Sequence, residues 1–82
     1  MSDRVDILVP EFGHGLTDAL VVEWLVSVGD DVERGDVVAV LETDKASVEL
    51  VAEKSGTIAD ILVAARSITT SGAVLYTLDE RR

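Results

Sequence analysis

The second half of the sequence repeats the first half in outline. At a spacing of 37 residues, residues 23–26 (EWLV) match residues 60–63 (DILV), and residues 35–38 (GDVV) match residues 72–75 (GAVL). Between these matches Val32 corresponds to Ile68 at a spacing of 36, which predicts compensating one-residue changes in the two turn segments. Each half is too short to bury its own apolar face, so the two halves are expected to pack on each other.

The apolar residues come in short runs rich in Val, Ile and Leu, separated by Gly, Asp or Ser, which is typical of an all-β domain. The predicted strands cover residues 6–9, 19–28, 37–42, 47–51, 56–64 and 74–78. In the second run Trp24 alternates with Glu23 and Leu25, which favours a core position for the indole over ligand stacking. Together with the repeat, these strands predict a small sandwich or flattened barrel with pseudo-twofold symmetry.

Length and residue content exclude several kinds of site. A chain of 82 residues is expected to form one domain over residues 1–82, with residues 79–82 as a polar tail. A domain this small buries only about 60% of its unfolded surface, which leaves little room for an internal substrate cavity. The absence of cysteine excludes disulfides, thiol catalysis and cysteine zinc sites. The single histidine, His14, lies between two glycines without a second ligand, so we expect a solvated loop residue and no metal site.

The charge excludes other partners. A net charge of −9, from 16 acidic and 7 basic residues, repels the phosphate backbone of nucleic acids, and an aromatic content of 4% offers no platform for base stacking. An acidic surface instead favours partners with basic patches. No apolar run approaches the roughly 18 residues of a spanning helix, and the first residues lack a basic targeting region. We therefore expect a soluble cytoplasmic domain that does not insert into membranes.

One of the two lysines stands in the link between the two halves. Residues 43–46 separate the predicted strands 37–42 and 47–51, a length that closes a hairpin and holds Lys45 in water. A catalytic lysine needs burial or a neighbouring cation to lose its proton, and here its neighbour is Asp44. Two interpretations remain from these residues alone: a solubilising turn residue, or an acceptor that another enzyme modifies.

Residues 42–47 (ETDKAS), together with the turns at 28–30 (VGD) and 35–36 (GD), resemble the lipoyl domains of 2-oxo acid dehydrogenase complexes. The resemblance extends over essentially the whole chain. It implies a flattened barrel of two four-stranded antiparallel sheets, with Lys45 at a hairpin tip at one end and both termini at the other. It also implies that Lys45 carries lipoic acid in amide linkage, and that Asp44 and Ala46 help lipoate ligase or lipoyl transferase to recognise the turn. Residues 11–18 correspond to the family's loop that contributes to recognition by the decarboxylase.

The function that the resemblance implies is carriage rather than catalysis. The arm of such a domain accepts an acyl group from a thiamin-dependent 2-oxo acid decarboxylase, passes it to coenzyme A at the acyltransferase core, and is reoxidised by the flavin enzyme dihydrolipoyl dehydrogenase. Because Ala46 and Ser47 follow the lysine, the chain is expected to be most like the acyltransferase of pyruvate dehydrogenase. An isolated domain of this kind is expected to be monomeric.

Alternatives differ in what happens at the lysine. Biotinyl domains share the fold but flank their lysine with methionines, whereas the only methionine here is Met1. An unmodified adaptor module is a further alternative, and an enzyme is the least favoured because the chain has no cysteine and no second histidine. The sequence departs from the family in two places. Residues 65–68 (ARSI) replace a second Gly-Asp turn, which leaves the conformation of that turn open, and residues 54–56 (KSG) replace a proline-containing stretch before the next strand.

Overall fold

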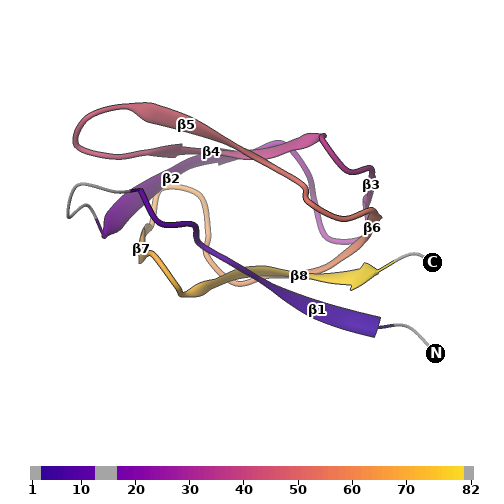
Figure 1. Ribbon diagram of the computed structural model, residues 1–82. Helices are drawn as coiled ribbons and strands as arrows, with labels where there is room; N and C mark the ends of the chain where they lie inside the picture. Colours follow the sequence, from indigo (N-terminus) through magenta and orange to yellow (C-terminus); the bar gives the residue numbers. More distant parts are fainter. Residues whose placement is uncertain (1–2, 13–16, 81–82) are drawn as a thin grey trace.

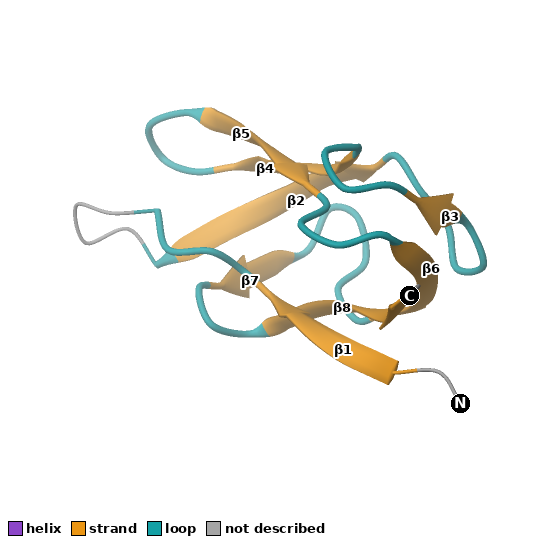
Figure 2. Cartoon of the chain, turned by 45° about the vertical axis from the view of Figure 1, so that its right-hand side comes forward, coloured by secondary structure: helices purple, strands orange, loops and turns teal. Residues whose placement is uncertain are grey.

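The described part of the chain consists of strands and the turns that connect them. The structure, a computed structural model, describes residues 3–12 and 17–80. Its strands are β1 (Asp3–Leu8), β2 (Asp18–Trp24), β3 (Asp31–Val32), β4 (Val37–Glu42), β5 (Ser47–Val51), β6 (Gly56–Ile61), β7 (Ile68–Thr70) and β8 (Val74–Glu80) (Figure 2). Within these residues no helix has the length and apolar character needed to cross a membrane.

The strands form two four-stranded sheets that lie face to face (Figure 1). One sheet has the order β1-β8-β6-β3 and the other has the order β5-β4-β2-β7. Every pairing in both sheets is antiparallel. The predicted fold class, an all-β sandwich or flattened barrel of two four-stranded antiparallel sheets, is confirmed.

The two sheets are built alike, and each half of the chain supplies two strands to the sheet of the other half. Strands β2, β4 and β5 of one sheet correspond in order to β6, β8 and β1 of the other. The short strand β3 follows β2 in sequence but pairs with β6, and β7 follows β6 but pairs with β2. Because of this exchange, neither half can complete a sheet alone, which is the physical basis of the predicted pseudo-twofold symmetry.

The irregularities of the strands repeat as well. The register between β2 and β4 shifts at Val22, and the register between β6 and β8 shifts at the equivalent Ala59. A bulge places the next residue on the opposite face of the sheet. For this reason Ala19 and Val21 are buried before the bulge in β2, whereas Trp24 points inward after it. The predicted inward position of Trp24 is confirmed, and the bulge explains why the alternation does not extend through the whole strand.

One part of the predicted repeat is wrong. The residue that corresponds to Val32 is Thr69, at the same spacing of 37 residues that relates the other positions. Val32 is 2% exposed and pairs with Gly56, and Thr69 is 6% exposed and pairs with the equivalent Ala19. Ile68, in contrast, is 65% exposed. Alignment of the two halves by hydrophobicity pairs Val32 with Ile68, whereas the backbone register places Thr69 in the equivalent inward position.

The core lies between the two sheets and draws on both halves. Its largest fully buried side chains come from β8, β6, β4 and β2: Tyr76, Leu75, Leu78, Ile58, Leu41, Val38 and Val21, with Val32 of β3. Trp24 and Tyr76 meet edge to face, with ring centroids 5.9 Å apart. The Trp24 indole Nε1–H also donates a hydrogen bond of 2.9 Å to the carbonyl of Val63. This contact joins an aromatic side chain of the first half to the backbone of the second.

The C-terminal strand is longer than predicted. Asp79 pairs with Arg4 and Thr57, and Glu80 pairs with Asp3 and Gly56. These two acidic residues therefore belong to β8, and the expected polar tail over residues 79–82 is corrected at its first two positions. Residues 81–82 lie outside the described residues. Strands β3 and β7 were not predicted, because runs of two or three residues are too short to give an alternating pattern.

Candidate functional site

The turn between β4 and β5 holds Lys45 at its tip. Glu42 pairs with Ser47, and beyond this pair the Thr43 N–H donates a hydrogen bond of 2.8 Å to the Ala46 carbonyl. Asp44 and Lys45 are therefore the two central residues of the turn, and both side chains are exposed. This arrangement agrees with the prediction from the sequence that the hairpin holds Lys45 in water.

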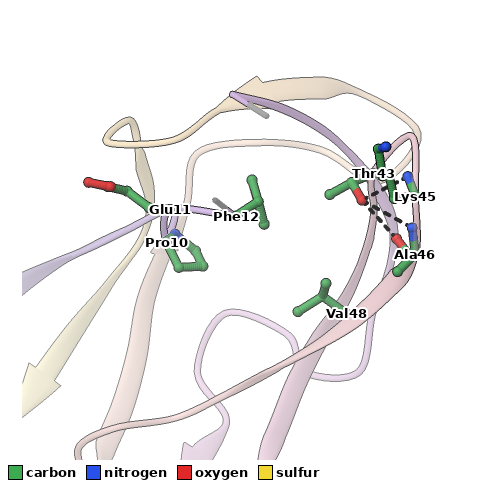
Figure 3. A pocket seen from close by; sticks show the side chains of 7 residues that line it. All are labelled: Pro10, Glu11, Phe12, Thr43, Lys45, Ala46 and Val48. Carbon is green, nitrogen blue, oxygen red and sulfur yellow. Dashed lines mark hydrogen bonds between the residues drawn. The ribbon is translucent and has the colours of Figure 1, made fainter. Parts of the chain in front are cut away.

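The side chain of Thr43 fixes the turn from within. Its hydroxyl accepts hydrogen bonds from the backbone N–H groups of Lys45 (3.3 Å) and Ala46 (3.2 Å), and it donates one to the Ala46 carbonyl (3.1 Å). A threonine hydroxyl that bonds the backbone two and three residues ahead stabilises a turn in the way that a backbone group would. The backbone on both sides of the lysine is thus held by one side chain (Figure 3).

The lysine turn and the chain ends lie at opposite ends of the molecule (Figure 1). The symmetry accounts for this placement. Strand β1 occupies beside β8 the position that β5 occupies beside β4. The β4–β5 turn is therefore equivalent to the gap between the end of β8 and the start of β1, which is where the chain begins and ends. Lys45 therefore lies at the end of the molecule opposite to the start of β1 and the end of β8.

An apolar hollow adjoins the turn. The hollow is formed by two segments that are distant in sequence and has a volume of about 370 Å³. Its lining residues are Pro10, Glu11, Phe12, Thr43, Lys45, Ala46 and Val48. In Figure 3, Pro10 and Phe12 lie on one side and Val48 on the other, while the Glu11 carboxylate points away from the turn. Phe12 also packs against the main core, which ties this segment to the barrel.

The charged residues around the turn are mostly acidic. Glu11, Asp18, Glu42 and Asp44 are all exposed, and the strand register places Asp18 and Glu42 at the same end of the sheet as the turn. Three other basic residues of the described part have partners away from the turn: Arg4 pairs with Asp60 and Asp79, Lys54 pairs with Glu80, and Arg34 shares a shallow surface with Lys54. Lys45 is the basic group at the tip of the turn, next to Asp44.

The structure brings together some of the predicted site residues and adds others. Asp44, Lys45 and Ala46 are adjacent at the tip, and residues 11–12 of the predicted recognition loop line the hollow beside them. His14 and the rest of residues 13–16 lie outside the described residues. The sequence included Phe12 in the predicted recognition loop but did not indicate its place in the hollow, and it did not indicate Val48 as a site residue. It also left the role of Thr43 open, although a threonine three residues before the end of a tight turn is a signal of such capping. The described part contains no cluster of three potential metal ligands.

Comparison with known proteins agrees with this geometry. The family model described as "Biotin-requiring enzyme", which covers biotin- and lipoyl-bearing domains, matches residues 5–78. The solution structure of the lipoyl domain of the 2-oxoglutarate dehydrogenase complex from Azotobacter vinelandii superposes with a TM-score of 0.79 at 33% identity, covering 95% of this chain and 99% of that one. The chain belongs to the biotin/lipoyl family and is a lipoyl domain.

Two curated relatives of this lipoyl domain have the same name, the dihydrolipoyllysine-residue succinyltransferase component of the 2-oxoglutarate dehydrogenase complex. The Bacillus subtilis protein is 36% identical over 75 residues, which is 92% of this chain and 18% of the relative. The Staphylococcus saprophyticus protein is 40% identical over 57 residues, which is 70% of this chain and 13% of the relative. The lipoyl domain thus spans less than a fifth of the length of these relatives.

These relatives correct one expectation. The sequence motif after the lysine predicted a domain most like that of pyruvate dehydrogenase. The relatives and the solved structure described above are all named for the 2-oxoglutarate complex. Two small residues after the lysine are therefore insufficient to identify the complex, because they lie in a short exposed turn and leave the rest of the surface unspecified.

Proposed function

We propose that this lipoyl domain carries lipoic acid in amide linkage on Lys45, as part of an acyltransferase of a 2-oxo acid dehydrogenase complex of the 2-oxoglutarate type. The observation that carries the proposal is the position of Lys45: an exposed amine at the centre of a two-residue turn that is fixed by Thr43, at the end of the molecule opposite the termini. The names of the relatives support the choice of lipoic acid and of the 2-oxoglutarate complex.

The residues of the turn suit the attachment reaction. An attached acyl group needs a primary amine that a second enzyme can reach, and no described side chain covers Lys45. Asp44 and Ala46 flank the amine on a backbone that Thr43 holds in one conformation, so they offer the modifying enzyme a defined shape. The amide that forms removes the positive charge of the lysine. Modification would leave the tip of the turn with the negative charge of Asp44 and without the positive charge of the lysine.

The bound group would supply the chemistry, since a dithiolane accepts an acyl group with reduction of its disulfide, passes the acyl group on, and is reoxidised. This chain contributes presentation and recognition. Its acidic end favours partner surfaces with basic patches, and charge complementarity of this kind raises the rate of encounter more than the affinity. We propose the thiamin-dependent decarboxylase, the acyltransferase core and the flavin dehydrogenase as the partners, in the cytoplasm.

The test of attachment uses the folded domain with lipoate, ATP and lipoate ligase. We expect the intact mass to increase by one lipoyl group, and peptide mapping to place the group on Lys45 rather than on Lys54. The variant Lys45→Arg should gain no mass, whereas Lys54→Arg should be modified at the normal rate. An unmodified domain, in a mixture where another lipoyl domain is modified, would contradict the proposal.

Two further comparisons define the type of carrier. Biotin ligase with biotin and ATP should leave the domain unmodified, and efficient biotinylation of Lys45 would favour the biotin alternative. The lipoylated domain should be acylated by the decarboxylase of a 2-oxoglutarate complex with a higher kcat/KM than by that of a pyruvate complex. The opposite preference would retain the carrier function but contradict the choice of complex.

A further inference from the structure

We infer that the apolar hollow beside the turn is a docking site for the arm on Lys45. The inference rests on the proposed function, because it requires a group on that lysine. In the docked position the methylene chain and the ring of the arm lie between the Pro10–Phe12 segment and Val48. The arm would then alternate between this position and the solvent, instead of extending freely at all times.

The hollow lies directly beside the lysine that would bear the arm. Lys45 is itself part of the wall of the hollow, so a group that is attached to its amine begins at the rim. A tethered group meets a neighbouring surface at an effective concentration of about millimolar, and weak contacts suffice to hold it for part of the time. The volume of about 370 Å³ falls within the roughly 300–1,000 Å³ of pockets that hold small organic molecules.

The lining of the hollow suits an apolar arm. Pro10, Phe12 and Val48 present apolar groups, and the carboxylate of Glu11 points out of the hollow (Figure 3). A methylene chain and a sulfur-containing ring bury apolar surface there without desolvating a charge. The free lysine differs, because its ammonium group would lose hydration against such a wall. Amide formation removes that charge, so the hollow favours the modified side chain over the unmodified one.

The test prepares the arm without relying on a ligase. The variant Lys54→Arg is acylated with an activated ester of lipoic acid, and the species that carries one group on Lys45 is isolated and identified by peptide mapping. A failure of enzymatic attachment is thus distinguished from a failure of docking. We expect nuclear Overhauser effects between protons of the arm and those of the Phe12 ring and Val48 methyl groups. Arm protons that relax as in free lipoamide, without these effects, would overturn the inference.

Matched variants assign the contact to the hollow. Phe12→Ala removes the largest apolar side chain of the lining, and we expect loss of the contacts between the arm and Val48. Leu62→Ala removes a comparable apolar side chain, 55% exposed and outside the hollow, and should leave the contacts unchanged. Phe12 also packs on the core, so its replacement changes more than the hollow. Val48→Thr is therefore a second variant, because threonine has nearly the volume of valine but is more polar. In this variant the contacts between the arm and Phe12 should weaken. Contacts that persist in both hollow variants would contradict the assignment.

Discussion

One hydroxyl group organises the turn that presents the lysine. Thr43 forms three side-chain hydrogen bonds with the two residues that follow Asp44, and the same residue closes the turn through its backbone N–H. The sequence was sufficient to predict that Lys45 would be exposed at a hairpin tip, because four residues between two strands leave few other conformations. It could not predict the hollow, because Phe12 and Val48 are separated by most of the first half and meet only in the folded barrel.

Thr43→Val tests this organisation, because valine keeps the branched shape and removes the hydroxyl. Exposed hydrogen bonds contribute about 1 kcal/mol or less each. A loss of about 1 kcal/mol of stabilisation lowers the equilibrium constant for the turn conformation by about fivefold. We therefore expect the rate of lipoylation of Lys45 to fall by about fivefold, and the Ala46 amide to exchange its hydrogen faster. Thr43→Ser restores the hydroxyl and should restore both properties. An unchanged rate in the valine variant would show that the ligase does not depend on this turn conformation.

At the scale of the elements, the repeat also preserves backbone conformation where it does not preserve residue type. Gly29 (φ 96°) and Gly35 (φ 98°) have their equivalents in Arg66 (φ 73°) and Gly72 (φ 87°). The departure of residues 65–68 from the family pattern therefore leaves the turn conformation intact. The sequence could not reveal this, because arginine rarely adopts a left-handed conformation and nothing local indicates one. The pairing of β7 with β2 and the bond from the Arg66 N–H to the Val21 carbonyl impose it.

Arg66→Gly should stabilise the domain. A left-handed backbone costs a non-glycine residue roughly 1–2 kcal/mol, and the added freedom of glycine in the unfolded chain offsets about 0.4–1 kcal/mol of the gain. We expect the free energy of unfolding, measured by urea denaturation, to increase by about 0.5–1 kcal/mol. The reverse change, Gly29→Arg, should decrease it by a similar amount, because a Cβ atom at Gly29 meets no atom within 4 Å and the effect is confined to the backbone. Equal stabilities in the two variants would contradict this explanation.

At the scale of the whole molecule, the two sheets depend on each other. Hydrophobic patterning was sufficient to predict an all-β sandwich of two similar halves, since alternation and turn residues are local properties. Hydrophobic patterning could not predict the exchange of β3 and β7 between the sheets. These strands are defined by their partner strands and not by their own two or three residues. A domain in which each half completes the sheet of the other is expected to unfold as one cooperative unit.

Tyr76 offers a direct measure of that cooperativity, because it is the only tyrosine and lies between the sheets against Trp24. Burial raises the pKa of its hydroxyl above 10.0, and the nearby carboxylate of Glu53 raises that pKa further. Above pH 10 the unfolded chain releases the phenolic proton while the native state keeps it, so the native state binds more protons. The contribution of Tyr76 to stability is therefore complete below pH 10 and is lost as the pH rises toward the native pKa.

We accordingly expect the free energy of unfolding to fall above pH 10, by up to about 1.4 kcal/mol for each unit by which the native pKa is raised. Phenolate absorbance and Trp24 fluorescence should change together, because the phenol is buried between the sheets and unfolding exposes both side chains. In Tyr76→Phe the other groups still titrate, and the decline above pH 10 should be less steep. If the phenolate instead formed near pH 10 with the fluorescence of the folded domain retained, Tyr76 would be reachable by solvent in a locally opened state. The two halves would then separate in part before the domain unfolds.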